Sequence, residues 1–384
     1  MTEIEALFAQ LSREPDFDAP ELRAHDAADL LLLETAASGS AGSVSDGGLV
    51  IIGDRHGALT FGAAEALGAT GIRVHQDALL SERALAANAA RLRPRIGPVD
   101  YEQHPLGESL LRGARLVLLR LPRSLAELDE IVWHIARWAD PGATVLAGGR
   151  DKHMSRGMND VLARGFAEVS AGLGRRKARV LTARSPRPAA ELGDPRFPVR
   201  ERDPELAFDL FAFGATFGGA GFDHGSRLLL RTLGEDPPSA VGRILDLGCG
   251  NGVLAVSAAL ARPDARVIAT DQSAAAVAAT RLSAESAGVA DRVETHRADA
   301  AEAVPAGWAD LVLLNPPFHT GSTVHAGVAH RLIRSAAPTL APGGELRLVF
   351  NSGLGYRPLV EREIGPTRQL ARDRTFTVLA ATRR

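Results

Sequence analysis

The chain has 384 residues, of which 45% are hydrophobic and 23% are charged, and its formal net charge at pH 7 is −2. This length suits two domains, and the composition is that of a globular protein. The single cysteine, Cys249, excludes an internal disulfide and a cysteine-based zinc site. The charge excludes the global basic excess of many nucleic-acid-binding proteins, so contact with RNA would need a local patch.

The N-terminal sequence and the apolar runs bear on location. Residues 1–10 are acidic and lack the basic-then-apolar layout of a signal peptide. No apolar run approaches the ~20 residues that cross a bilayer. Together with the single cysteine, these features predict a cytoplasmic protein with no membrane partner. We also expect no metal site.

Three segments of the first half recur in the second half. Their apolar strands and glycines keep one register over more than 60 residues, which chance matches do not explain. The paired segments are 26–35 with 223–232 at an offset of 197 residues, and 49–60 with 245–255 and 114–122 with 309–317 at an offset of 195. We interpret this as an internal duplication that gives two similar domains.

The copy in the first half has lost the polar residues at the ends of its strands. At the constant offset of 195, the replacements are Arg55 for Gly250, Gln76 for Asp271, His104 for Asp299 and Arg120 for Asn315. A slip of one residue would restore an acid, Asp77, at the second of these positions. We therefore expect a degenerate first domain that keeps the fold.

Between the two copies lies a basic and proline-rich region. Residues 150–202 carry 13 Lys+Arg against 6 Asp+Glu, which fits either a solvated surface or an RNA-binding patch. Residues 183–204 contain five prolines, which remove backbone donors and fix φ, so we expect an extended linker without helix or strand. The predicted organisation is a degenerate domain at 1–185, a linker at 186–204 and a catalytic domain at 205–384.

The second half alternates strands and helices with short loops. The patterns predict strands at 242–248, 265–271, 291–299, 309–315, 343–350 and 374–383, and helices at 252–262, 273–288 and 328–340. Gly288 would close the second of these helices. Such alternation predicts an α/β fold, a parallel sheet covered on both faces. The whole chain is then expected to form two tandem Rossmann-like folds.

A glycine-rich loop, DLGCGNG at 246–252, joins the first strand of this half to its first helix. Glycines let the backbone turn sharply and let a ligand approach closely. Ligands of open α/β sheets bind beyond the carboxyl ends of the strands. Asp271 ends the next strand about 20 residues later, where an acid can hold two ribose hydroxyls. Asp299 ends the following strand, where it can accept from an adenine amine.

This loop resembles the first motif, D-x-G-x-G-x-G, of the class I S-adenosylmethionine-dependent methyltransferases. The resemblance implies that Asp246 orients the loop and the methionine moiety, while Gly248 and Gly250 pass under the cofactor. Asp271 would take the ribose and Asp299 the adenine. The remaining residues of the expected cofactor site are Cys249, Asn251, Gly252, Gln272, Ala300 and Asn315. Cys249 is interpreted as a small loop residue and not as a nucleophile.

The sequence NPPF at 315–318 predicts that the group that receives the methyl is an exocyclic nucleobase amine. The lone pair of an exocyclic nucleobase amine is delocalised into the ring, so the enzyme needs acceptors for its two N–H bonds more than a strong base. The side-chain carbonyl of Asn315 and the backbone carbonyl of Pro316 are such acceptors. Pro316 and Pro317 fix their positions, and the acceptors favour the positive charge that builds on nitrogen. Phe318 can stack on the base.

Four further candidates lie near these motifs: Phe217, Asp223, Gly225 and His319. His319 is interpreted as a loop histidine that bonds to backbone, with a general base as the alternative. Asp223 lies in TFGGAGFDHGSRLLLRTL at 216–233. It either caps the helix that starts near Gly225 or faces the methyl-donor site.

The degenerate half, the linker, F-x-x-x-x-F-D-x-G-S-x-L-L-L, DLGCGNG and NPPFH together resemble the bacterial ribosomal RNA guanine-N2 methyltransferases of the small- and large-subunit type. The resemblance covers nearly the whole chain, and residues 150–181 resemble the end of the N-terminal domain in the large-subunit enzymes. It implies S-adenosylmethionine as cofactor and a first domain that helps in RNA binding and stability, where Arg120 and Arg123 suit phosphate. The expected partner is ribosomal RNA, naked or in a partly assembled subunit, and the expected protein is a monomer.

Other hypotheses stay open at this point. NPPF or NPPY also serves adenine N6 and the side-chain amide of glutamine in a protein substrate. A non-catalytic RNA-binding or ribosome-assembly protein is a third hypothesis, although the second half keeps every cofactor position that the motif defines. A flipped base is expected, because the amine must reach a pocket at the sheet edge.

Overall fold

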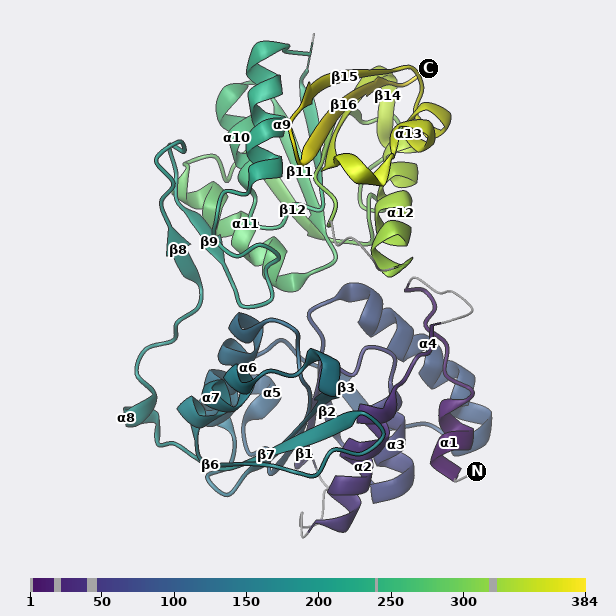
Figure 1. Ribbon diagram of the computed structural model, residues 1–384, viewed down its shortest axis with the longest axis vertical. Helices are drawn as coiled ribbons and strands as arrows, with labels where there is room; N and C mark the ends of the chain where they lie inside the picture. Colours follow the sequence, from purple (N-terminus) through teal and green to yellow (C-terminus); the bar gives the residue numbers. More distant parts are fainter. Residues whose placement is uncertain (1–2, 17–21, 40–46, 239–240, 318–322) are drawn as a thin grey trace. The chain divides into compact units, whose positions relative to one another are not determined.

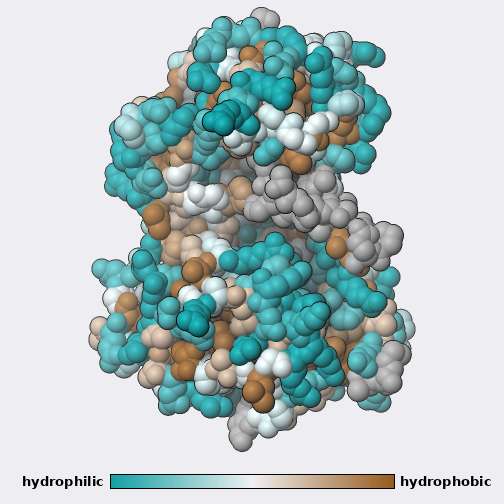
Figure 2. Space-filling view, in the orientation of Figure 1, coloured by the Kyte–Doolittle hydropathy of each residue, from teal (hydrophilic) through white to brown (hydrophobic). Residues whose placement is uncertain are grey.

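A computed structural model describes residues 3–16, 22–39, 47–238, 241–317 and 323–384. The chain forms two compact units, Met1–Phe197 and Pro198–Arg384, and each contains a seven-stranded sheet (Figure 1). The residues on the face seen in Figure 2 are mostly hydrophilic. Within the described ranges, no helix combines the length and the apolar character that crossing a membrane requires.

The sheet of the N-terminal unit has the strand order β3-β2-β1-β4-β5-β7-β6. Its strands are β1 (Leu49–Ile52), β2 (Ile72–His75), β3 (Tyr101–Gln103), β4 (Leu116–Arg120), β5 (Thr144–Arg150), β6 (Phe166–Ala171) and β7 (Ala178–Pro186). Its helices are α1 (Glu3–Phe8), α2 (Ala27–Ser38), α3 (Ala58–Leu67), α4 (Leu79–Ile96), α5 (Glu108–Leu111), α6 (Leu125–Trp138), the 3-10 helix η1 (Asp151–His153), α7 (Arg156–Gly165) and α8 (Ala189–Leu192).

The sheet of the C-terminal unit has the order β12-β11-β10-β13-β14-β16-β15, and a small hairpin, β8 (Val199–Glu201) and β9 (Leu210–Ala212), precedes it. The strands of the sheet are β10 (Arg243–Leu247), β11 (Arg266–Asp271), β12 (Val293–Arg297), β13 (Ala309–Leu314), β14 (Leu340–Asn351), β15 (Thr367–Arg372) and β16 (Phe376–Thr382). Its helices are α9 (His224–Glu235), α10 (Val253–Ala261), α11 (Ala274–Ser286), α12 (Thr323–Thr339), η2 (Ser352–Leu354) and α13 (Arg357–Glu363).

The two sheets have the same order, which confirms the predicted tandem Rossmann-like folds. In each sheet, five neighbouring strands are parallel and the last two pairings, such as β5 with β7, are antiparallel. The register is also shared, because Ile52 pairs with His75 where Leu247 pairs with Thr270. Gln76 therefore occupies the position of Asp271, and the alternative with a one-residue slip to Asp77 is wrong.

Apolar clusters cover both faces of each sheet. In the C-terminal unit, Ile244 and Leu311 belong to the cluster that includes residues of α9, α10 and α11. Leu245 and Val312 belong to the cluster that includes residues of α12 and α13. Side chains alternate between the faces of a strand, so strands covered on both faces are almost wholly apolar until they end. The polar residues that follow these strands meet at the carboxyl edge, where ligands of such sheets bind.

The structure differs from the predictions at four places. The proline-rich stretch 183–204 was expected to lack secondary structure, but it contains the end of β7, the helix α8 and the strand β8. Prolines are compatible with strand ends and with short edge strands, which explains the error. In the C-terminal unit, α12 begins earlier than predicted, and α13 and β15 were not predicted.

Candidate active site

The glycine-rich loop follows β10 and leaves open space above two of its glycines. Gly248 and Gly250 have φ values of 83° and 56°, and apart from their chain neighbours no atom of the described residues lies within 4 Å of the place where a Cβ would stand. Gly252 has φ 81°, but a Cβ there would lie 2.9 Å from Thr280 on α11. Gly248 and Gly250 thus fit a loop that a ligand can approach, whereas Gly252 allows α11 to pack closely.

Asp246 lies within β10 below this loop and is fully buried. Its Oδ2 accepts from the backbone N–H of Ala255 at 2.9 Å, while Oδ1 has no hydrogen-bond partner among the described residues. Burial, together with the nearby charge of Asp271, raises the pKa of Asp246 to about 7. A buried carboxylate oxygen without a donor is costly, so a cationic ligand above the loop would favour its charged form.

Asp271 ends β11 and is held by two backbone donors. Its Oδ2 accepts from Gly250 N at 3.1 Å and its Oδ1 from Ser273 N at 3.0 Å. These bonds fix the carboxylate beside the glycine loop, next to the half-buried Gln272. A carboxylate offers about four acceptor sites, so these two bonds do not exhaust its capacity to receive ribose hydroxyls.

Asp299 follows β12 and forms an ion pair with Arg331 on α12. Its backbone N–H donates to the side chain of Glu302 at 2.9 Å. The next residue, Ala300, has a left-handed backbone with φ 50°, which turns the chain at the end of the strand. The residue predicted to accept from an adenine amine is therefore engaged by an arginine that the sequence did not single out.

Two loop residues predicted for the cofactor site face the protein. Asn251 is buried and its Nδ2 donates to the carbonyls of Gly219 and Gly221, both at 3.0 Å. The amide thus holds the segment before α9 on the glycine loop. Cys249 is buried, and its Sγ accepts from Thr280 Oγ1 at 3.2 Å. Burial raises the pKa of the Cys249 thiol, so it stays protonated, in keeping with a packing role.

Asn315 is the first residue after β13, and its half-buried side chain meets the start of α9. Its Nδ2 donates to Ser226 Oγ at 2.9 Å and to Asp223 Oδ1 at 3.2 Å. Its Oδ1 has no hydrogen-bond partner among the described residues. Leu247 and Leu314 are paired in register, so Gly248 and Asn315 come next on adjacent strands. The Asn315 oxygen and the glycine loop therefore lie at the same edge of the sheet.

The neighbours of Asn315 are placed only in part. Pro316 is buried and Pro317 is half-buried. Phe318 and His319, predicted for base stacking and as a loop histidine, lie outside the described residues. Phe217 is 62% exposed on the segment before α9.

Asp223 serves as the N-cap of α9, because its Oδ1 accepts from Ser226 N at 3.0 Å. The same oxygen receives Asn315 Nδ2, so the two interpretations of Asp223, cap and site residue, both describe its contacts. A Cβ on Gly225 would lie 3.1 Å from Asp223 Oδ1 and 3.4 Å from Asn315 Oδ1. A glycine at this position keeps the space around the amide open.

Together these residues fit S-adenosylmethionine. The open space above Gly248 and Gly250, the unpartnered oxygen of Asp246 and the fixed carboxylate of Asp271 match a ligand with a cationic amino-acid part and a ribose. The case for Asp299 as the acceptor of an adenine amine is weaker, because its carboxylate already forms an ion pair with Arg331.

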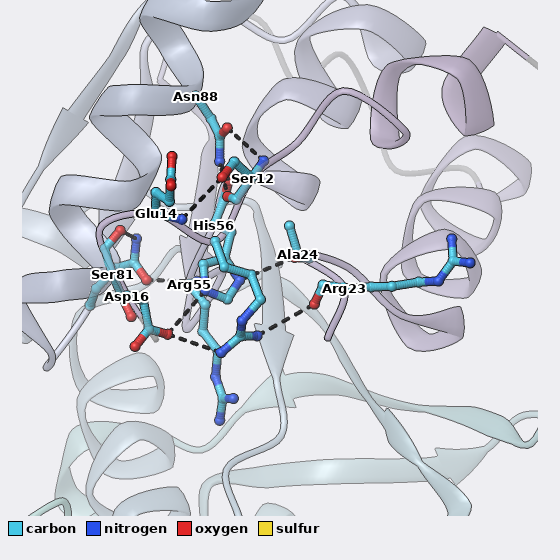
Figure 3. A network of polar contacts seen from close by, with 11 residues as sticks. Ser12, Glu14, Asp16, Arg23, Ala24, Arg55, His56, Ser81 and Asn88 are labelled. Atoms are coloured by element: carbon cyan, nitrogen blue, oxygen red, sulfur yellow. Dashed lines mark hydrogen bonds and ion pairs between the residues drawn. The ribbon is translucent and has the colours of Figure 1, made fainter. Parts of the chain in front are cut away.

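The corresponding loop of the N-terminal unit carries larger side chains where the glycine loop has Gly250 and Asn251 (Figure 3). His56, at the position of Asn251, bonds through Nδ1 to Ala24 O and through Nε2 to Asp16 Oδ2, both at 3.2 Å. Arg55 keeps the left-handed backbone of Gly250 with φ 59°, but it brings a long cationic side chain. Gln76 Oε1 accepts from Arg55 N at 2.6 Å. The hydrogen bond from the loop to the end of the next strand is thus kept in the N-terminal unit, but Gln76 lacks the negative charge of Asp271.

The N-terminal counterpart of Asn315 is also engaged in contacts within its own unit. Arg120 binds Asp26, the N-cap of α2, at 2.9 and 3.1 Å, and its Nη1 lies 3.1 Å from Asp29 Oδ1. Burial raises the pKa of Asp29 to about 6, although Arg120 acts against this rise. The expectation that Arg120 suits phosphate is therefore wrong, because its guanidinium is engaged by two carboxylates.

Two residues that the structure places at the site, Ser226 and Arg331, were not predicted from the sequence. A signal for Ser226 existed in the spacing of Asp223 and Ser226, which is that of an N-cap and the residue three positions later. No sequence signal pointed to Arg331, whose contact depends on how α12 packs.

The fold and the site define a Rossmann-like methyltransferase with a second, degenerate copy of its own fold. Residues 208–380 match the Methyltransferase small domain family, and residues 1–187 match the RLMG N-terminal domain family. The chain is 35% identical to the ribosomal RNA large subunit methyltransferase G of Pseudomonas entomophila (strain L48), over 97% of this chain and 96% of that protein. It is 32% identical to the protein of the same name in Streptomyces coelicolor, over 97% of both chains.

The chain belongs to the family of the ribosomal RNA large subunit methyltransferase G proteins. Its fold is also that of the T. thermophilus 16S rRNA N2 G1207 methyltransferase (RsmC), solved in complex with AdoMet and guanosine. That structure matches with a TM-score of 0.74 and 21% identity, over 97% of this chain and 100% of the other. The predicted family and enzyme class are confirmed.

Proposed function

We propose that this protein transfers the methyl group of S-adenosylmethionine to the exocyclic N2 amine of a guanine in large-subunit ribosomal RNA. The observation that carries the proposal is the orientation of Asn315. Both N–H groups of its amide bond to the start of α9, while Oδ1 has no hydrogen-bond partner among the described residues and lies at the same edge of the sheet as the glycine loop. The names of the relatives, which cover nearly the whole chain, support the rRNA substrate.

The bound cofactor supplies an electrophilic methyl group. The residues of this chain hold the nucleophile. Asn315 Oδ1 accepts one N–H of the guanine amine, and the backbone carbonyl of Pro316 accepts the other. Both acceptors favour the positive charge that develops on nitrogen, and because they belong to a proline-fixed segment they need little reorganisation. No strong base is required before transfer, because the proton is lost from a much more acidic, methylated nitrogen.

The N-terminal unit has a different role in this proposal, which is to hold RNA. Arg150, at the end of β5, pairs with Ala178, so the turn between β6 and β7 lies at the carboxyl edge of the sheet. This turn exposes Arg175, Arg176 and Lys177. We call these three residues, together with Arg150 and Lys152, the basic rim.

Arginines of the basic rim can exchange a carboxylate partner for a phosphate. Arg175 and Arg176 pair with Glu34 at 3.3 and 2.8 Å, with side chains that are 65% and 54% exposed. Ion pairs this exposed contribute at most about 1 kcal/mol, so a phosphate can replace the carboxylate. Phosphate contacts position RNA without reading its sequence, which suits a unit that has lost its cofactor site.

We also propose a form of the substrate, a location and an oligomeric state. The substrate is ribosomal RNA, either naked or in a partly assembled subunit, and the protein acts as a cytoplasmic monomer. The duplication supports the monomer, because it supplies two sheets of the same fold within one chain. The domain boundaries proposed from the sequence, 1–185, 186–204 and 205–384, lie close to the two compact units.

Mass spectrometry of nuclease-digested rRNA from a strain that lacks this gene tests the proposal. One N2-methylguanosine should disappear from the large-subunit rRNA and return when the gene is restored. Loss of an N6-methyladenosine would point to the other nucleobase amine. Unchanged rRNA in the deletion strain would refute the proposal.

A further inference from the structure

The amide of Asn315 is bound by two residues of α9 that do not belong to the NPPF motif. Asp223 and Ser226 occupy the N-cap and the third helical position, and each accepts one hydrogen bond from Asn315 Nδ2, at 3.2 and 2.9 Å. An amide nitrogen has two N–H bonds, so both are used. Ser226 is buried, whereas Asp223 is exposed.

The acceptor at Asp223 determines which end of the amide faces the substrate. A carboxylate can only accept hydrogen bonds, so it repels the carbonyl end of the amide and attracts the nitrogen end. Turning the Asn315 amide by 180° would place Oδ1 against Asp223 Oδ1 and break that hydrogen bond, whereas the Ser226 hydroxyl could then donate to Oδ1. Without Asp223, the two orientations would differ little, and in one of them a donor would face the N–H bonds of the substrate amine.

The N-terminal unit shows that this contact between helix start and strand end belongs to the duplicated architecture. Asp26 and Asp29 stand at the same two positions of α2, and they bind Arg120, the counterpart of Asn315. There the contact uses the whole polar end of the side chain. In the C-terminal unit it uses only the nitrogen and leaves the oxygen for another partner.

We propose that Asp223 and Ser226 are positioning residues: both hold the Asn315 amide in place, and Asp223 fixes it with its oxygen toward the substrate amine. This inference rests on the proposed function for its catalytic consequence, but the orientation of the amide does not depend on which acceptor is methylated. Asp223 thus caps α9 and sets the polarity of the site with one oxygen.

The first test needs no substrate. The chain has five asparagines, so selective ¹⁵N-asparagine labelling gives few side-chain signals, and Asn315→Ala identifies the Nδ2 pair of Asn315. In the wild-type protein these protons should exchange slowly with water. In Asp223→Ser, which keeps a side-chain cap for α9, their exchange should become at least several-fold faster. Unchanged exchange in Asp223→Ser would overturn the inference, even if the rRNA substrate proved to be wrong.

The second test measures methyl transfer to undermodified rRNA under single-turnover conditions. Asp223→Ser should lower the transfer rate about tenfold with little change in the Kd for S-adenosylhomocysteine, because one charge-assisted bond is removed. Asp223→Asn keeps an oxygen at this position and should retain more activity than Asp223→Ser. Ser226→Ala should also slow transfer.

A double-mutant cycle separates positioning from mere stabilisation of α9. In the Asn315→Ala background, Asp223→Ser should cause no further loss, because the residue through which it acts is already gone. An equal loss in both backgrounds would show a structural effect and contradict the inference. If the wild-type protein left rRNA unmethylated, the proposed function would fail while the exchange measurement would still decide the orientation of Asn315.

Discussion

Arg120 and Asp26 form a two-pronged ion pair in the N-terminal unit, with contacts of 2.9 and 3.1 Å, at the positions that Asn315 and Asp223 hold in the C-terminal unit. The duplicated fold thus joins the start of a helix to the end of a strand in both units. In the N-terminal unit this contact serves stability, whereas in the C-terminal unit it leaves the oxygen of Asn315 for the substrate in the proposed reaction.

The first prediction concerns the stability of the N-terminal unit. Arg120→Ala removes the cation between Asp26 and the buried Asp29 and leaves two carboxylates facing each other. Breaking a buried pair costs about 3 kcal/mol of unfolding free energy. Denaturant unfolding should show this decrease, while Arg123→Ala, an exposed neighbour, should change stability by less than about 0.5 kcal/mol. Equal stability of the two variants would refute the structural role of Arg120.

The second prediction concerns the number of cofactor sites. Titration calorimetry with S-adenosylhomocysteine should give one site per chain, because in the N-terminal counterpart Arg55 replaces Gly250 and Gln76 lacks the charge of Asp271. Asp271→Ala should weaken binding strongly. Gln76→Ala, the matched change in the other copy, should leave binding unchanged. A stoichiometry of two would contradict this assignment.

The third prediction is a pH dependence that comes from Asp246. Its pKa is raised by burial to about 7, so the native state binds a proton that the unfolded chain has released above about pH 4. Stability should therefore fall as pH rises from about 4 to 7 and then stay level, relative to Asp246→Asn. Thermal unfolding of the two proteins across this range measures the difference, and parallel curves would contradict the raised pKa.

The same group predicts how cofactor binding responds to pH. A cationic ligand favours the ionised form of Asp246, so binding below about pH 7 should release a proton and the affinity should rise as pH approaches 7. Calorimetry in buffers of different ionisation enthalpy counts the released protons. Asp246→Asn should bind with weaker pH dependence, and proton release that persists in this variant would assign the effect to another group.

The fourth prediction concerns the basic rim. The triple variant Arg175→Ala, Arg176→Ala, Lys177→Ala should weaken rRNA binding and reduce the slope of log Kd against log salt by about 1 for each phosphate that the protein no longer neutralises. Arg91→Ala with Arg93→Ala removes two exposed cations of α4 and serves as the control. An unchanged slope in the triple variant would place the RNA-binding surface elsewhere. Binding of S-adenosylhomocysteine should stay the same in both variants.

The architecture was predictable because the signals that specify it are local or repeated. Apolar strands that end in glycine or acid, and their recurrence at an offset of 195, indicated both sheets and their correspondence. The short elements α8, β8 and β15 escaped prediction, because prolines and charges hide elements of only a few residues. Asp246, Gly248, Gly250 and Asp271 were assigned from their motif, and the geometry of the loop supports these assignments.

Contacts between distant elements could not be predicted from the sequence. The bonds of Asn315 to Asp223 and Ser226 join residues about 90 positions apart, and so do the bonds of Arg120 to Asp26 and Asp29. Arg120 looked suited to phosphate because a strand-end arginine carries no sign of its partners. Only the packing of α2 against β4 shows that its charge is already used.

The most direct measurement is methyl transfer by the purified protein to large-subunit rRNA from the deletion strain, with a labelled methyl group and mass spectrometry of the product. The wild-type protein should produce N2-methylguanosine at one position. Asn315→Ala should bind S-adenosylhomocysteine with nearly unchanged Kd and should lose transfer by at least about 10²–10³-fold. Normal transfer by Asn315→Ala, or label on any group other than a guanine N2, would contradict the account.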